Sequence, residues 1–178
     1  MNSINQQQEE DTYKPLSGQE AVEKIRELAK KAGTCFFCTQ IKQSVAIKTR
    51  PMAVQKIDDQ GNLWFLSAND SHHNKEIATD PSVQLFFQGS AHSDFLSIYG
   101  QASISEDKTR IDELWEPLLK TWFTEGKSDP RISVIKVVPS ESYYWDNKHG
   151  NAIAFVKMVT GAVLGKTIDD SIEGTLKV

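Results

Sequence analysis

Short segments rich in β-branched and aromatic residues, separated by turn signals, fill most of the chain between residues 34 and 146. Side chains of these types fit the pleated surface of a sheet, so each segment predicts a β-strand. The segments cover residues 34–39, 44–50, 52–57, 63–67, 82–88, 95–105, 132–138 and 143–146. Pro51 limits pairing between the segments 44–50 and 52–57, and the second resumes the strand of the first, so the segments amount to six or seven strands. Strands with helices inserted between them favour an α+β fold built on a closed or partly closed antiparallel barrel.

Three helices are predicted, over residues 18–32, 70–79 and 111–119. The first is amphipathic, with Ser17 and Glu20 spaced as a capping box and Gly33 placed as a left-handed C-cap. The second is short and polar and is expected at the surface. Pro117 interrupts the third, so we expect a kink or a second short helix there.

The two ends of the chain differ from this pattern. Residues 1–16 lack apolar periodicity and cannot bury enough surface to offset their ordering entropy, so we expect a flexible tail. One globular domain is expected over residues 17–165, and a polar tail over 166–178. Within the domain, the segment 152–164 carries apolar residues on a wide arc, which favours docking against a partner.

Composition excludes several classes of protein. The 178 residues fit one domain, and the net charge of −4 offers no broad attraction for nucleic acid. The longest apolar run, residues 152–156, is far shorter than the roughly 20 residues of a membrane span. The first ten residues contain neither a basic region nor an apolar stretch, so no secretory signal is expected and the protein is predicted to be cytoplasmic.

Cys35 and Cys38 are the only cysteines. A structural zinc site needs further ligands at matched spacing, and the chain has no second C-x2-C or H-x3-5-H pattern. Both lie on a predicted strand, so we interpret them as buried thiols, with metal and redox roles as the alternatives. No metal site is expected.

Three local features have the chemistry of a binding site. Arg50, before Pro51, offers a fixed fork of donors suited to a phosphate or to the carbonyl edge of a heterocycle. The alternative is an ordinary arginine on an edge strand. In the second feature, a strand ending near Ser67 feeds a short helix, whose free amides are joined by the positive charges of His73 and Lys75. That combination suits a phosphate, with a solvated helix start or a histidine-bound metal as the alternatives.

The third feature is the run of aromatic residues Tyr143-Tyr144-Trp145 before Asp146. Exposed aromatic side chains stack on planar rings or anchor subunit interfaces, whereas buried ones pack a core. The sequence leaves both roles open.

Together and in this order, these features resemble the pyridoxamine 5'-phosphate oxidase-like, FMN-binding split-barrel superfamily, and most closely its general stress protein 26 branch. The resemblance covers roughly residues 17–178. The matching stretches are TRPM (49–52), NLWFLSANDSHHNKEI (62–77), DPSVQLFF (80–87), SDFLSIYGQASIS (93–105), IDELWEPLLKTWFTEGKSDPR (111–131), YYWD (143–146) and GTLKV (174–178).

The resemblance implies a six-stranded antiparallel split barrel with peripheral helices, assembled as a homodimer that binds FMN in clefts between its subunits. FAD is the alternative cofactor. The implied cofactor-binding residues are Arg50, Pro51 and Met52 on the isoalloxazine and ribityl side, Phe65, Leu66 and Ser67 along the flavin edge, Ser71, His73, Asn74 and Lys75 near the phosphate, and Trp145 from across the dimer.

The apolar composition of the predicted surface also favours a dimer. The residues expected at an interface are Phe86, Phe87, Phe95, Tyr99 and the segment 152–164. Left in water, they would form a larger apolar patch than soluble monomers usually carry.

Two departures from the family pattern matter for function. His73 stands where the family usually has lysine, so phosphate binding should weaken as the imidazole loses its proton, unless Lys75 substitutes. The stretch 148–150 does not reproduce the Arg-x-His element of true pyridoxamine phosphate oxidases.

The sequence therefore predicts an FMN-binding, stress-associated flavoprotein, an oxidoreductase of undefined substrate. The alternatives are a flavin-binding or sensing module without catalysis and, less favoured, a pyridoxamine 5'-phosphate oxidase. No catalytic residue is assigned.

Overall fold

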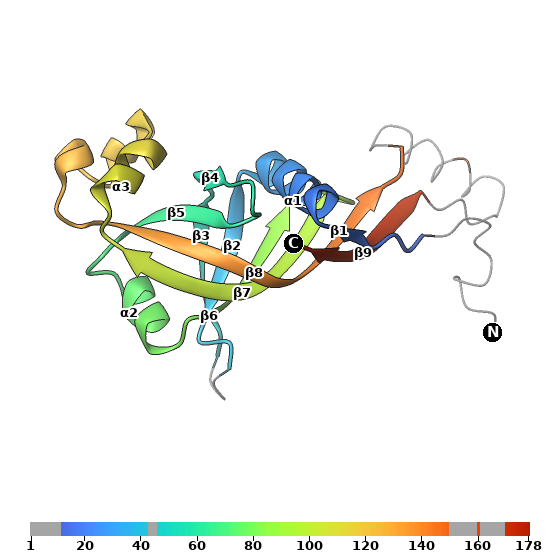
Figure 1. Ribbon diagram of the computed structural model, residues 1–178, viewed down its shortest axis with the longest axis horizontal. Helices are drawn as coiled ribbons and strands as arrows, with labels where there is room; N and C mark the ends of the chain where they lie inside the picture. The colour runs from blue at the N-terminus through green and yellow to red at the C-terminus, as the bar shows by residue number, and fades with distance from the viewer. Residues whose placement is uncertain (1–11, 43–45, 150–159, 161–169) are drawn as a thin grey trace.

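The computed structural model describes residues 12–42, 46–149, 160 and 170–178 (Figure 1). Nine strands lie in these ranges: β1 (Leu16–Ser17), β2 (Thr34–Thr39), β3 (Lys48–Ala53), β4 (Lys56–Ile57), β5 (Leu63–Ala68), β6 (Ser82–Gln88), β7 (Phe95–Ser105), β8 (Ile132–Asn147) and β9 (Ser171–Lys177). The helices are α1 (Gln19–Ala32), α2 (His72–Thr79) and α3 (Lys108–Leu114), followed by the 3₁₀ turns η2 (Pro117–Thr121) and η3 (Gly126–Ser128).

The sheet has the order β1-β9-β8-β7-β6-β2-β3, and β5 pairs with β8 outside this path. β7 pairs with one edge of β8. On the other edge, β5 pairs with the first part of β8 and β9 with its last part, and all three pairings are antiparallel. No pairing joins β3 to β5 within the described ranges, so the barrel stays open between them. The predicted α+β antiparallel barrel is confirmed, and its six expected strands are β2, β3 and β5 to β8.

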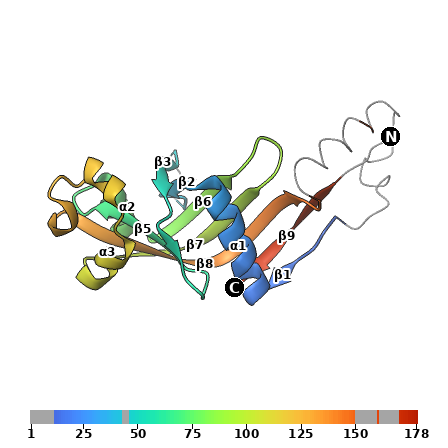
Figure 2. The ribbon, with the colours of Figure 1, turned by 90° about the horizontal axis from the view of Figure 1, so that it is seen from above.

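Helix α1 supplies one side of the core. Its buried residues Ile25 and Leu28 join inward-facing side chains of the strands, among them Phe37, Phe65 and Leu85. Figure 2 shows α1 lying across the sheet. A second apolar cluster lies under α3, where Ile111, Leu114 and Phe123 pack on β5 and β8. No helix in the described part of the chain has the length and apolar character of a membrane span.

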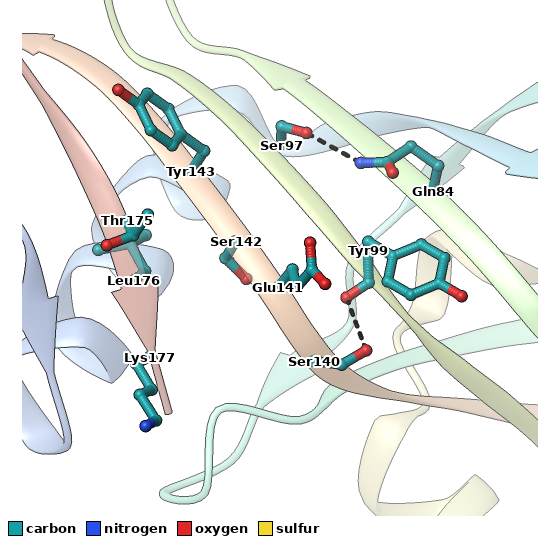
Figure 3. A pocket seen from close by; sticks show the side chains of 10 residues that line it. All are labelled: Gln84, Ser97, Tyr99, Ser140, Glu141, Ser142, Tyr143, Thr175, Leu176 and Lys177. Atoms are coloured by element: carbon teal, nitrogen blue, oxygen red, sulfur yellow. Dashed lines mark hydrogen bonds between the residues drawn. The ribbon is translucent and has the colours of Figure 1, made fainter.

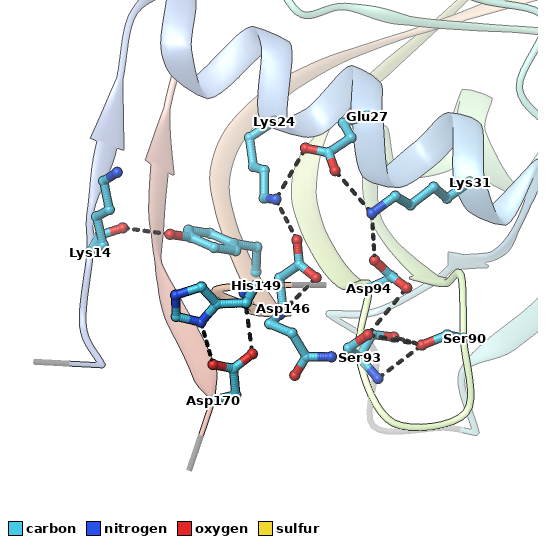
Figure 4. Close-up of polar contacts among 12 residues, drawn as sticks. Lys14, Lys24, Glu27, Lys31, Ser90, Ser93, Asp94, Asp146, His149 and Asp170 are labelled. Atoms are coloured by element: carbon cyan, nitrogen blue, oxygen red, sulfur yellow. Dashed lines mark hydrogen bonds and ion pairs between the residues drawn. The ribbon is translucent and has the colours of Figure 1, made fainter. Parts of the chain in front are cut away.

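Ion pairs join α1 to the end of β8 and to the loop between β6 and β7 (Figure 4). Lys24 bridges Glu27 and Asp146 of β8, and the Asp146 carboxyl is 7% exposed. Two turns later, Lys31 Nζ lies 2.8 Å from Asp94 Oδ1 in the β6–β7 loop. The hydrogen bonds that Lys31 donates to Asp94 and Glu27 raise its pKa above the ordinary value. The contacts hold the helix in register with the strands that it covers.

The start of α1 differs from the prediction. Ser17 belongs to β1, and Gly18 is the N-cap, with a φ of 57° and no side-chain cap. The Gly18 amide bonds to the Lys177 carbonyl at 2.8 Å, so strand pairing fixes the backbone where the capping box was expected. The C-terminal prediction is confirmed, because Gly33 has a φ of 68° and its amide bonds to the Ala29 carbonyl.

Two predicted strand breaks are absent. β3 runs through Pro51, which is opposite Phe36, because β3 is an edge strand where proline's missing donor costs little. β8 is one strand of 16 residues instead of two. Its register with β7 shifts beside Gly100, where an added Cβ would come 2.4 Å from the Val138 carbonyl oxygen.

Of the kink or second short helix expected at Pro117, the structure has the second short helix. α3 ends at Leu114, and Pro117 begins the separate turn η2.

The prediction of a polar C-terminal tail is wrong for residues 171–177. They form β9, which pairs with β8 and buries Leu176. Residues 12–16, assigned to the flexible N-terminal tail, run beside β9, where Lys14 N donates to the Glu173 carbonyl at 2.7 Å. Gly174 permits this approach, since a Cβ there would lie 2.3 Å from the Lys14 carbonyl oxygen. Residues 1–11 and, apart from Thr160, the segment 152–164 lie outside the described ranges.

Candidate functional site

The connection from β5 to α2 has the geometry of an anion-binding cradle. Ser71 is the N-cap of α2, and its hydroxyl accepts from the Asn74 amide at 3.2 Å. The Ser67 hydroxyl, at the end of β5, lies 3.4 Å from that of Ser71. The amides of His72 and His73 occupy the first helical positions and cannot bond within the helix. The two hydroxyls therefore lie at the positive end of the helix dipole, where two amides have no partner within the helix, and the Ser71 hydroxyl donates to Asn74 Oδ1 at 3.2 Å.

A buried network holds this cradle in place. Asn74 Nδ2 donates to Ser133 Oγ at 2.7 Å, and Ser133 Oγ donates to the Ser67 carbonyl at 2.9 Å. Three elements, β5, α2 and β8, are thereby tied together. Ser133 was not among the predicted site residues; its only signal was a hydroxyl within the apolar strand sequence ISVIKVV.

Arg50 contacts α2 from strand β3. Its Nη1 lies 2.8 Å from Glu76 Oε2, and Thr39 Oγ1 donates to the same oxygen at 2.6 Å. Burial alone would raise the pKa of Glu76, but the hydrogen bonds from Arg50 and Thr39 bring it below the ordinary value. Glu76 is therefore a carboxylate at neutral pH. Neither Glu76 nor Thr39 was predicted at the site, because an acidic residue on a polar helix gives no sign of its partner.

His73 occupies a different place from the one predicted. Its side chain is 3% exposed, and its ring meets Phe37 edge-on with centroids 4.4 Å apart. Neither ring nitrogen has a hydrogen-bond partner among the described residues. Burial, and then the charge of Arg50, lowers the pKa of His73 to about 4. A pKa this low makes the imidazole neutral at pH 7, in contrast to the protonated ring that was expected to attract phosphate.

The other predicted site residues have varied surroundings. Phe65 is fully buried, with its ring against Phe37, and Leu66 lies in the cluster beneath α3. Met52 packs on the main core from β3. Lys75 is exposed on α2 and forms no ion pair within the described ranges. The structure thus brings Arg50 and the Ser67 to Lys75 connection around α2, while most of the apolar members serve the core.

Trp145 lies far from this cradle within one chain. Twelve residues of β8 separate it from Ser133. At roughly 3.3 Å per residue this is about 40 Å of strand. In Figure 1, α2 and the β1–β9 pair lie at opposite ends of the molecule. Trp145 and the Ser67–Ser133 end of the cradle in the same chain therefore do not form one small-molecule site.

The outer face of the sheet carries the remaining aromatic residues. Trp145 is 44% exposed and its ring centroid is 4.6 Å from that of Tyr143, whereas Tyr144 points into the core. Phe36, Phe86, Phe95 and Trp145 line a pocket of about 290 Å³ on this face. Phe86 is 46% exposed, but Phe87 is buried in the core, which corrects its expected place at an interface.

A polar hollow of about 490 Å³ continues along the same face (Figure 3). Gln84 Nε2 donates to Ser97 Oγ at 2.8 Å within it. Glu141 and Thr175 lie among its other lining residues. The outer face is thus apolar at one end and polar in the middle.

The two cysteines are buried thiols, as predicted. Burial raises the pKa of Cys35 to about 12, so it stays protonated at neutral pH. In the 148–150 stretch, His149 Nδ1 lies 2.6 Å from the buried Asp170 Oδ1.

An open antiparallel barrel with a polar cradle at its β5–α2 connection defines a split-barrel protein of the α+β class. The model of the family described as pyridoxamine 5'-phosphate oxidase like matches residues 20–169. The chain belongs to this family, which confirms the superfamily resemblance.

Individual relatives agree with this assignment. Protein bli-3 of Neurospora crassa is 26% identical over 127 residues, which are 66% of this chain and 61% of that protein. A structure from Jannaschia sp. CCS1 described as a general stress protein 26 is 19% identical and superposes with a TM-score of 0.74, covering 89% of this chain and 99% of its own. The general stress FMN/FAD binding protein of Xanthomonas citri is 25% identical, with a TM-score of 0.59 over 69% of this chain and 86% of its own.

Proposed function

We propose that this protein is a stress-associated flavoprotein that binds FMN and acts as an oxidoreductase of undefined substrate. The observation that carries the proposal is the cradle of hydroxyls and helix amides beside Arg50, within a family member whose Xanthomonas relative is named for FMN/FAD binding. A phosphate ester attached to a planar ring suits such a cradle next to a donor fork.

The residues present fit a flavin. Ser67, Ser71 and the first amides of α2 would hold the phosphate, while Arg50 would donate to the ring edge. Nη1 is the only Arg50 nitrogen that hydrogen-bonds among the described residues, so other donors of the guanidinium remain for a ligand. When bound, the flavin supplies hydride and electron transfer, and the protein supplies binding and orientation.

We further propose that the working form is a homodimer with flavin sites between its subunits. Trp145 cannot approach the cradle of its own chain, but a second copy packed on the outer sheet face could bring its Trp145 there. That face exposes Phe36, Phe86 and Trp145 at 59%, 46% and 44%. Aromatic residues in such a patch are typical of interfaces.

One observation favours the alternative of a flavin-binding or sensing module without catalysis. His73 is neutral and buried, and Glu76 is held by two donors, so both titratable groups serve the structure rather than proton transfer. Hydride chemistry does not require a protein acid or base, so the oxidoreductase stays the favoured function.

Anaerobic mixing of flavin-loaded protein with NADH or NADPH separates the two functions. Bleaching of the flavin absorption by either nucleotide is expected for the oxidoreductase. A flavin that dithionite bleaches, but that neither nucleotide nor a panel of other electron donors does, would establish the binding module instead.

A further inference from the structure

The charges around the cradle are balanced, although the ligand proposed for it carries a phosphate. Arg50 forms an ion pair with α2, in which Glu76 neutralises it at 2.8 Å. Lys75 is exposed on α2, and exposed Asp70 directly precedes the N-cap. Arg131, whose carbonyl accepts from the Asn69 amide, is itself paired with Asp129 at 2.7 Å. Within the described residues, both guanidinium groups beside the cradle are therefore ion-paired, and the unpaired cation of α2, Lys75, is exposed to solvent.

The buried member of the first helical turn does not change this balance. His73 is 97% buried, packs on Phe37, and has no hydrogen-bond partner at either nitrogen among the described residues. With a pKa of about 4 it carries no charge at neutral pH. Hydrogen bonds from hydroxyls and amides, rather than ionic attraction, are what the site presents to a phosphate.

We infer that Glu76 determines the ligand class of this site: by neutralising Arg50, it lets the uncharged flavin riboflavin bind with an affinity close to that of FMN. This inference rests on the proposed flavin-binding function. The shared ring and ribityl chain would provide most of the affinity, and the terminal phosphate would add little. Glu76 is thus a specificity-determining residue that sequence analysis did not single out.

The test compares binding of FMN and riboflavin to apo-protein by quenching of flavin fluorescence. The Kd values are expected to differ by less than about tenfold, because no free cation supplements the hydrogen bonds that the cradle gives the phosphate. The FMN affinity should also change less than about twofold between about 50 mM and about 500 mM salt, since screening acts on net charge.

Glu76→Gln is the decisive variant, because a glutamine oxygen still accepts from Thr39 and Arg50 while the negative charge is lost. FMN should bind about five- to tenfold more tightly, with a new salt dependence, while riboflavin binding stays within about twofold. Glu23→Gln, on the exposed surface of α1, makes the same charge change away from the cradle and should alter neither ligand.

Each outcome separates the inference from the function beneath it. If FMN binds more than about tenfold tighter than riboflavin, or if Glu76→Gln leaves the ratio of the two affinities unchanged, the inference is overturned and flavin binding stands. If neither flavin binds, both are overturned. The comparison in the unmodified protein decides the matter even where the variant fails to fold.

Discussion

Arg50 of β3 and Glu76 of α2 form an ion pair in which Nη1 lies 2.8 Å from Oε2. Thr39 of β2 donates to the same carboxylate oxygen, so three elements converge on one atom. The pair orients the guanidinium beside the helix that forms the cradle. It also lowers the net charge of the candidate site, where the buried side chain His73 is neutral and Lys75 is exposed.

Arg50→Ala tests the role of the guanidinium in ligand binding. FMN affinity should fall by the roughly 1.5–3 kcal/mol of a hydrogen bond from a charged donor, which is about ten- to a hundredfold. Titration of apo-protein with FMN measures it, with circular dichroism as the check on folding. Unchanged affinity would remove Arg50 from the site.

The buried imidazole of His73 predicts acid sensitivity. Its folded pKa of about 4 lies below the ordinary 6.5, so the unfolded chain binds the proton more tightly than the folded one. Stability is then fully present above pH 6.5 and is lost as pH falls toward 4, by roughly 3 kcal/mol over the whole window.

Urea unfolding at several pH values measures this loss. His73→Leu, which cannot titrate, should flatten the pH dependence between 6.5 and 4. His72→Leu removes an exposed neighbour and should keep the parent's slope. A slope that persists in His73→Leu would assign the acid sensitivity to other groups.

Between about pH 6 and 8, a neutral His73 should leave FMN affinity flat. Sequence analysis predicted a decline over this interval, from a protonated imidazole in the ordinary titration range. Binding titrations at several pH values distinguish the two. A decline that His73→Leu abolishes would mean that the ring is charged and near the phosphate.

Ser133→Ala tests the network beneath the cradle. It would leave Asn74 Nδ2 without its 2.7 Å partner in a buried position. The free energy of unfolding should drop by about 1–3 kcal/mol, the cost of an unsatisfied buried donor. Ser140→Ala, at an exposed position of the same strand, is the matched control and should cost under about 0.5 kcal/mol. Equal losses in the two variants would contradict a special role for Ser133.

A shared site predicts complementation between two defective chains. Arg50→Ala and Trp145→Ala homodimers should each hold FMN weakly. A mixed dimer would contain one site with an intact Arg50 and the partner's intact Trp145, so mixing should restore up to one tight FMN per mixed dimer. Sedimentation reports the assembly and titration the stoichiometry. No recovery on mixing, despite exchange of subunits, would contradict the shared geometry.

Periodicity predicted the barrel well, because strands with a buried face alternate visibly, as in SVQLFFQ of β6. It failed where tertiary pairing decides. β9 appears polar in sequence, yet Leu176 and Gly174 suffice to seat it between β8 and the Lys14 backbone. Pro51 suggested a break, but at the sheet edge its missing amide has no partner to lose.

The candidate site was predicted in its positions but not in its charges. Ser67, Ser71 and Arg50 converge around α2 as expected. The sequence carries no information on which carboxylate faces Arg50, or on the depth of His73, because both depend on how α2 packs against β2. These two features leave the cradle with less positive charge than expected.

The central claim is that the chain binds a flavin, and the visible absorption spectrum of the protein tests it most directly. Protein purified without added cofactor, and again after addition of FMN and removal of the excess, should show bound flavin, approaching one flavin per chain in the loaded sample. Absence of flavin absorption in both samples, with the protein folded, would contradict the account.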